Sequence, residues 1–168
     1  MAALQAGIAR ALDKGNADNG DATVTADPAT VLASAEGNHV CADCSKPEVE
    51  WASVNLGILL CIECSGIHRG LGVHFSKVRS VLLDRWTPEM LLHMCRVGNA
   101  RANRRYEATL ADNPAYAKPT RSTPKAEKER FTRAKYCDQL FMDESVPLKA
   151  DLDDLGITDD SGTWKRVC

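Results

Sequence analysis

The 168-residue sequence predicts an α+β fold in which α-helices surround a small three-stranded antiparallel sheet. Three observations lead to this prediction. Two Cys-x-x-Cys pairs enclose sixteen residues rich in β-branched and apolar side chains, as is typical of a strand-containing segment. A second β-rich run follows at residues 78–83. Further along the chain, threonine stands directly before proline at two places, which is a signal for the start of a helix.

The two cysteine pairs are Cys41 with Cys44 and Cys61 with Cys64. Four thiolates at this spacing are the usual ligands of a tetrahedral zinc site, whereas a single pair would equally suit a redox site. We therefore expect a C4 zinc finger that holds one Zn²⁺. Because four cysteine ligands leave no open position for water, this zinc is expected to be structural and not catalytic.

The segment between the cysteine pairs is expected to form a β-hairpin at residues 51–60, with a turn near Gly57. Residues 62–70 are expected to form a short helix that carries the second pair. On such a helix Arg69 lies roughly 140° around the axis from Cys64 and about 7.5 Å along it. We therefore expect Arg69 to be anchored by the metal site but to point away from it.

The other elements follow from capping and periodicity. Thr87 and Thr123 are each expected to cap a helix whose first residue is proline. Gly98 is expected to separate two helices, and Leu140 to face the core from the last helix. The expected elements are, in order, a helix at 29–35, a strand at 78–83, helices at 88–97 and 99–110, and a helix at 124–142.

Composition indicates one domain with two tails. We expect a flexible N-terminal extension at 1–27, the zinc-finger domain at 28–142 and an acidic C-terminal tail at 143–168. The three cysteines outside the two pairs form no disulfide framework, so a reducing, cytoplasmic compartment is expected. No apolar run approaches the length of a transmembrane helix.

The net charge of −2 conceals an uneven distribution. Residues 65–105 hold eight basic and two acidic side chains, whereas residues 138–168 hold eight acidic and three basic ones. The basic centre of the chain is therefore expected to meet an anionic partner.

Around these cysteines the sequence resembles the ArfGAP domain family, whose pattern is C-x2-C-x16-C-x2-C-x4-R. The resemblance covers roughly residues 28–142 and rests on many short stretches in the same order. They include 41–44 (Cys-Ala-Asp-Cys), 50–57 (Glu-Trp-Ala-Ser-Val-Asn-Leu-Gly), 61–69 (Cys-Ile-Glu-Cys-Ser-Gly-Ile-His-Arg), 71–74 (Leu-Gly-Val-His), 76–80 (Ser-Lys-Val-Arg-Ser), 86–89 (Trp-Thr-Pro-Glu) and 134–136 (Ala-Lys-Tyr).

The resemblance implies a GTPase-activating protein for Arf-family small GTPases. Arg69 would be the arginine finger that this family inserts, in trans, into the GTPase, so the chain would not be an enzyme by itself. Trp51 would support the helix that carries Arg69, while His68 is expected to pack or to form a hydrogen bond behind it. Candidate contacts with the GTPase are Asn55, Ile67, Leu71, Lys77, Val78 and Arg79.

The implied partner is a GTP-bound Arf-family GTPase, and an anionic membrane surface is a further candidate. The chain is expected to be a monomer, to bind no nucleic acid and to act at the periphery of Golgi, endosomal or plasma membranes. Gly70 departs from the family, whose members commonly have serine or asparagine there. Two alternatives stay open: a GATA-like zinc finger that binds nucleic acid, and an adaptor that binds the GTPase without activating it.

Overall fold

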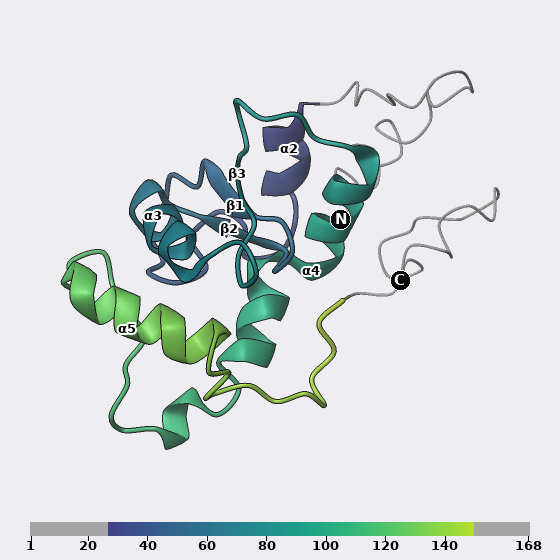
Figure 1. The fold of residues 1–168 in the computed structure, drawn as a ribbon. Coiled ribbons are helices and arrows are strands. Elements are labelled where there is room, and N and C mark those ends of the chain that lie inside the picture. The colour runs from purple at the N-terminus through teal and green to yellow at the C-terminus, as the bar shows by residue number, and fades with distance from the viewer. Residues whose placement is uncertain (1–26, 150–168) are drawn as a thin grey trace.

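The structure is a computed structural model that describes residues 27–149, drawn in Figure 1. Nearly all of the expected N-terminal extension, and the expected tail beyond residue 149, lie outside the described residues. The elements are α2 (Pro28–Ala33), β1 (Trp51–Ser53), β2 (Ile58–Leu60), α3 (Ile62–Leu71), β3 (Val78–Ser80), α4 (Pro88–Tyr106), the 3₁₀ turn η1 (Leu110–Asp112) and α5 (Lys125–Tyr136).

The three strands form an antiparallel sheet in the order β2-β1-β3, which confirms the predicted architecture. Side chains of β2 enter two different apolar clusters, because successive residues of a strand point to opposite faces. Leu59 packs with residues of α2 and the first half of α4. Ile58 and Leu60 pack with the four cysteines and with Tyr136 of α5. The sheet is therefore covered on both faces.

The hairpin between β1 and β2 turns at Gly57, whose φ of +70° favours glycine. A Cβ atom at this position would lie 2.5 Å from Cβ of Val97, so helix α4 lies directly against the turn. The glycine thus allows the sheet and α4 to approach each other closely.

The third strand is shorter than predicted and ends at Ser80 instead of residue 83. The Ser80 hydroxyl accepts hydrogen bonds from the backbone N–H groups of Leu82 and Leu83, at 3.3 and 3.1 Å. The Asp84 carboxylate accepts the Ser80 N–H at 2.6 Å. These bonds form a turn directly after β3, and the apolar run that suggested a longer strand leaves Leu82 and Leu83 exposed.

Helix α4 begins as predicted, since the Thr87 hydroxyl accepts a hydrogen bond from the backbone N–H of Met90. The predicted break at Gly98 is also present, with φ of 67° and ψ of 160°. The two halves follow each other without a loop between them. The second half ends at Tyr106, earlier than the predicted residue 110, and the separate turn η1 follows.

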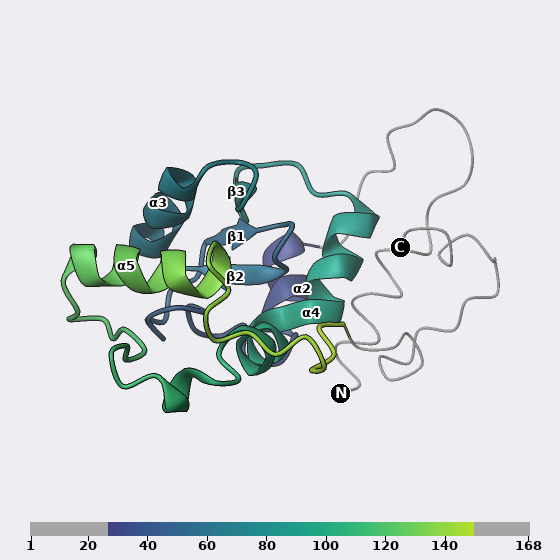
Figure 2. The same ribbon diagram turned by 60° about the horizontal axis from the view of Figure 1, so that its bottom comes forward.

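The prediction for α5 was wrong at both ends. The Thr123 hydroxyl accepts the backbone N–H of Thr120, so the N-cap position falls to Pro124. The helix ends at Tyr136, well before residue 142. After this end the chain turns, which leaves Leu140 exposed and instead buries Phe141 against Phe131. Helix α5 packs beside α3, as the rotated view in Figure 2 shows.

Candidate functional site

The four predicted ligands lie together at the junction of the sheet with α3. Cys41 and Cys44 come from the loop before β1, Cys61 is the N-cap residue of α3, and Cys64 lies in its first turn. All four are buried, and their sulfur atoms lie within 4.8 Å of one another. The structure therefore brings together the whole cluster that the sequence predicted.

The geometry of this cluster fits a tetrahedral metal site. Zn–S bonds of about 2.3 Å in a tetrahedron place neighbouring sulfur atoms about 3.8 Å apart. The sulfur atoms of Cys44 and Cys61 are 3.7 Å apart. Four thiolates this close together repel one another unless a cation lies between them, so the donor set suits one divalent ion with no open coordination position.

Behind the first cysteine pair, the carboxylate of Asp43 is fully buried and joins three elements. Its Oδ2 lies 2.9 Å from Nε2 of His68 in α3. Its Oδ1 accepts hydrogen bonds from Nζ of Lys135, at 3.1 Å, and from the Tyr136 hydroxyl, at 2.9 Å, both in α5. Asp43 thus fastens α3 and α5 to the cysteine loop.

The charges in this cluster stabilise one another. Burial disfavours the charged form of Asp43, but the positive charge of Lys135 and the hydrogen bond with His68 outweigh it, so the pKa of Asp43 is lowered. Burial likewise disfavours the charged form of Lys135, but Asp43 and Glu107 outweigh it and raise the pKa of Lys135. Burial, together with the charge of Asp43, raises the pKa of Tyr136.

Arg69 lies on the opposite side of α3 and is exposed to solvent. Its guanidinium carbon is 4.4 Å from the centre of the Trp51 ring, which is a cation–π contact. Trp51 itself packs on the apolar cluster that contains the four cysteines. Trp51 therefore touches the arginine side chain directly, and its role in supporting the Arg69 helix stays a prediction.

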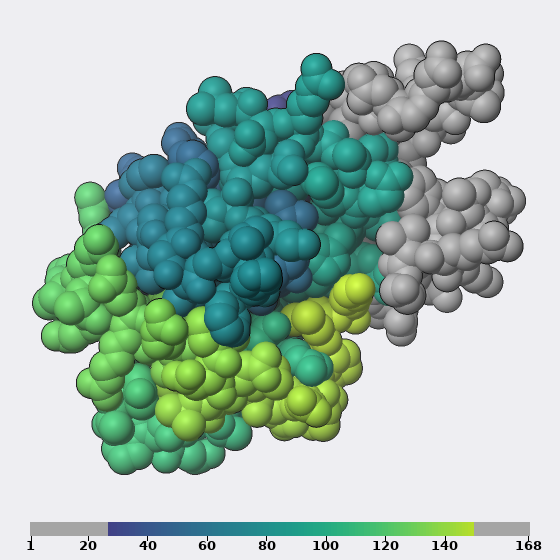
Figure 3. Space-filling view, viewed as in Figure 1, coloured from purple at the N-terminus to yellow at the C-terminus, as the bar shows by residue number. Residues whose placement is uncertain are grey.

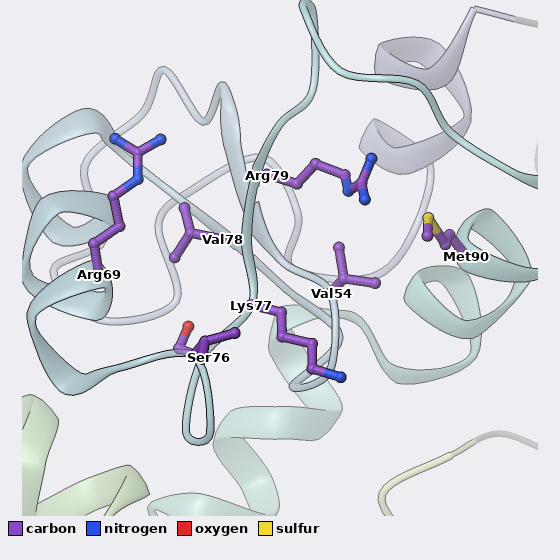
Figure 4. A pocket seen from close by; sticks show the side chains of 8 residues that line it. Val54, Arg69, Ser76, Lys77, Val78, Arg79 and Met90 are labelled. Carbon is purple, nitrogen blue, oxygen red and sulfur yellow. The ribbon is translucent and has the colours of Figure 1, made fainter.

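A hollow of about 440 Å³ opens beside Arg69. Figure 4 shows Arg69 and Val78 on one side of the β3 segment, with Arg79 and Met90 on the other. In the space-filling view, the chain from α3 to the start of α4 forms the upper part of the face turned to the viewer (Figure 3). The hollow is lined by Val54, Arg69, Val73, Ser76, Lys77, Val78, Arg79 and Met90.

The candidate contact residues divide into three groups. Lys77, Val78 and Arg79 line the hollow together with Arg69. Asn55 and Leu71 are accessible outside it. Ile67 is only 4% exposed, so its side chain packs inside the domain and offers no surface to a partner.

The sequence does not predict several residues of the site. Val54, Val73 and Met90 add apolar surface to the basic hollow. Asp43 and Lys135 lie in stretches that resemble the family, but the sequence predicts no role for either of them. Lys135 follows Ala134 on the inward side of an amphipathic helix. A lysine at such a position indicates a buried ion pair, because lysine is rarely buried without a partner.

The fold and the site define a small α+β domain built on a four-cysteine cluster that suits a metal ion, with an exposed arginine at the edge of a basic hollow. The sequence profile of the ArfGap family, described as GTPase activating protein for Arf, matches residues 27–145. The chain therefore belongs to the ArfGap family.

Two relatives illustrate the match. The chain is 51% identical over 109 residues to the human "Arf-GAP with coiled-coil, ANK repeat and PH domain-containing protein 3", a match that covers 65% of this chain and 13% of the relative. It is 40% identical over 148 residues to "ADP-ribosylation factor GTPase-activating protein AGD1" of Arabidopsis thaliana, covering 75% of this chain and 18% of the relative. The chain thus spans less than a fifth of the length of these relatives.

The fold agrees with a solved structure. The solution structure of the ArfGap domain of human RIP superposes with a TM-score of 0.63 at 19% identity, covering 80% of this chain and 97% of that one. At this identity the likeness supports the fold alone. Among residues 27–149, no helix is both long and apolar enough to cross a bilayer.

Proposed function

We propose that this chain activates GTP hydrolysis by an Arf-family GTPase and that Arg69 is the catalytic arginine it supplies in trans. The observation that carries the proposal is the placement of Arg69. Its guanidinium is exposed at the edge of the hollow and stacks on Trp51, while the opposite side of its helix is held by buried contacts.

The chemistry needs such a residue because negative charge spreads over the oxygens of the phosphoryl group during its transfer. An arginine supplied to a small GTPase accelerates hydrolysis by roughly 10³–10⁵. This corresponds to about 4–7 kcal/mol of barrier. Arginine suits the task because its charge is permanent and its planar donors can meet two oxygens at once. In this proposal the partner binds the GTP, so the chain is not an enzyme by itself.

We further propose that the ion held by the four cysteines is a structural Zn²⁺. Such an ion neutralises thiolate charge and couples its binding to folding. The chain's own residues then determine where Arg69 lies, because Cys61 and Cys64 place the first turn of α3 and His68 fixes its last turn against Asp43.

The basic hollow is the proposed contact surface for the GTP-bound partner. Lys77 and Arg79 add positive charge beside Arg69, and Val73 and Val78 add apolar surface. This mixture suits a protein surface around a bound nucleotide better than the edge of a DNA groove. Family membership likewise favours the GTPase over the nucleic-acid alternative. We propose action as a monomer on Arf at the cytoplasmic surface of Golgi, endosomal or plasma membranes.

The test is single-turnover hydrolysis of GTP on a purified Arf, with wild type beside Arg69→Lys. We expect wild type to accelerate hydrolysis and the variant to lose roughly 10³-fold or more of that acceleration. Arg104→Lys is the matched control, because Arg104 pairs with Glu36 and lies outside the hollow. It is expected to keep full activity.

Both variants are first checked for zinc content and for folding. A folded Arg69→Lys protein with wild-type activity would rule out the arginine finger. A folded, zinc-loaded wild type that binds Arf·GTP without accelerating hydrolysis would instead favour the adaptor alternative. Repeating the assay with anionic vesicles separates that outcome from a requirement for membrane.

A further inference from the structure

A chain of hydrogen bonds runs from the first cysteine pair through His68, which precedes Arg69, to an exposed asparagine beside Lys77. Successive atoms are separated by 2.9, 2.9, 2.7 and 3.2 Å. Apart from the last residue, every member is at most 3% exposed. The members, in order, are Asp43, His68, Ser76, Ser53 and Asn55.

The contacts of Asn55, at the outer end, determine which group donates in each of these hydrogen bonds. Oδ1 of Asn55 accepts the backbone N–H of Lys77 at 2.7 Å, and Nδ2 of Asn55 donates to the backbone carbonyl of Phe75 at 2.9 Å. These two bonds distinguish the oxygen from the nitrogen of the amide group. Because this oxygen can only accept, the Ser53 hydroxyl must donate to it.

The donor and acceptor roles of the Ser53 and Ser76 hydroxyls follow in the same way. A hydroxyl has a single proton to donate. Since Ser53 donates to Asn55, it must accept from Ser76, at 2.7 Å. Since Ser76 donates to Ser53, it must accept from Nδ1–H of His68, at 2.9 Å.

The inner end of the chain also requires a donor. The Asp43 carboxylate pairs with Lys135 and accepts hydrogen bonds from Lys135 and Tyr136 on its other oxygen. Its Oδ2 therefore accepts from Nε2–H of His68. His68 consequently faces an acceptor on both sides, and its ring packs in a T-shaped contact with the ring of Tyr136 at a centroid distance of 5.0 Å.

We propose that His68 is a positioning residue that donates from both ring nitrogens and thereby joins the cysteine loop to the loop that carries Lys77. His68 directly precedes Arg69, so the same hydrogen-bond chain sets the position of Lys77 relative to Arg69 across the hollow. The inference rests on the proposed function, because it assigns this chain a role in presenting the hollow to the GTPase.

The first test measures the ring nitrogens of His68 in zinc-loaded wild-type protein at neutral pH, by ¹⁵N NMR. We expect both nitrogens to show the shifts of protonated imidazole nitrogens. A spectrum with one unprotonated ring nitrogen would overturn the proposal. This measurement needs no GTPase, so its result is independent of the activity.

The second test removes a link that cannot touch a partner. Ser53 is fully buried, and Ser53→Ala breaks the chain between Ser76 and Asn55. The control is Ser65→Ala, because Ser65 is equally buried but its hydroxyl donates to the carbonyl of Ile62 in its own helix. Amide hydrogen exchange at Lys77 is expected to become about tenfold faster in Ser53→Ala and to stay unchanged in the control.

The same pair of variants separates positioning from general destabilisation. In Ser53→Ala the KM for Arf·GTP is expected to rise about tenfold while kcat changes little, since one buried hydrogen bond is lost and Arg69 stays in place. A fall in kcat with unchanged KM, or equal effects in Ser65→Ala, would contradict the positioning role. If wild type proves inactive, the proposed function fails, while the exchange and ring-nitrogen measurements still decide the inference.

Discussion

The two sides of helix α3 differ sharply. One side is buried and carries Cys61 and Cys64 together with His68, which is 0% exposed. The other side carries Arg69 and two glycines, all open to solvent. The proposed catalytic arginine lies on the exposed side. The hydrogen bonds that hold the helix in place, from His68 to Asp43 and Ser76, are made by the buried side.

The difference shows how an exposed arginine can still be well placed. A long side chain in water has many conformations and loses entropy when it is held in one of them. Here the backbone of α3 is fixed by the cysteines and by Asp43, and only the arginine side chain remains free to adapt. Variants that change one side of α3 alone therefore test whether the buried side positions the helix and the exposed side serves the activity.

Removal of the metal should have the largest effect, because it releases the buried side altogether. Metal binding by four cysteines is coupled to folding by about 10–16 kcal/mol in small zinc-finger peptides. We expect a strong chelator, or Cys61→Ser, to unfold the domain and to abolish zinc binding. Circular dichroism and metal content measure the two effects.

Cys137→Ser is the control for this experiment, since Cys137 is partly exposed and lies outside the four-cysteine cluster. It should retain both metal and fold. A chelated protein that keeps its full helix content would show that the metal does not hold α3 in place.

Lys135→Met should have the next largest effect. Lys135 is fully buried and bonds to Asp43 and Glu107, at 3.1 and 2.7 Å. Its loss leaves two carboxylates without their buried partner, which we expect to lower the free energy of unfolding by about 3 kcal/mol. Denaturant unfolding measures this change. Lys125→Met removes only an exposed pair with Glu129 and should cost under about 0.5 kcal/mol.

The direction of the pKa shift of Lys135 determines how the stability cost of Lys135→Met depends on pH. Asp43 and Glu107 raise the pKa of Lys135, so its contribution is fully present below the unfolded-state value of about 10.4 and is lost only as pH rises through the higher folded value. The cost of Lys135→Met should therefore be the same from about pH 6 to pH 9. A cost that falls steeply within this window would contradict the charged state of the buried lysine.

The sequence predicted the parts of the domain that depend on local signals. Cysteine spacing identified the four residues that cluster, and Gly98 identified the break in α4. The sequence-based prediction failed where a long-range or competing contact determines the end of an element. The end of β3 depends on a hydrogen bond between Ser80 and Asp84, and the burial of Phe141 in place of Leu140 depends on where α5 stops. Hydrophobic periodicity predicts neither the end of β3 nor the burial of Phe141.

Trp51→Leu addresses the exposed side of α3. It removes the aromatic face beneath Arg69, and such a contact is worth about 0.5–1 kcal/mol at an exposed site. We expect single-turnover hydrolysis to slow about two- to fivefold. Tyr116→Leu is a matched control, because Arg130 lies at the same 4.4 Å over the Tyr116 ring, away from the hollow. Equal slowing in both variants would show that the Trp51 contact does not act through Arg69.

Gly70→Ala should have a small effect of the opposite sign on stability. Gly70 lies within α3, and a Cβ atom there would meet nothing within 4 Å. Alanine should therefore raise the free energy of unfolding by about 0.5–1 kcal/mol, because glycine loses more backbone freedom when a helix forms. Gly66 offers the same open surroundings one turn earlier, so Gly66→Ala should give a similar gain.

The comparison of these two glycines tests whether flexibility beside Arg69 matters. Both backbones are helical, so the freedom that glycine offers after Arg69 is not used in this structure. We expect both alanine variants to accelerate GTP hydrolysis by Arf as much as wild type does. Slower hydrolysis in Gly70→Ala alone would mean that the helix must loosen next to Arg69 when the partner binds. The buried side of α3 would then fix the start of the helix but not the position of its arginine.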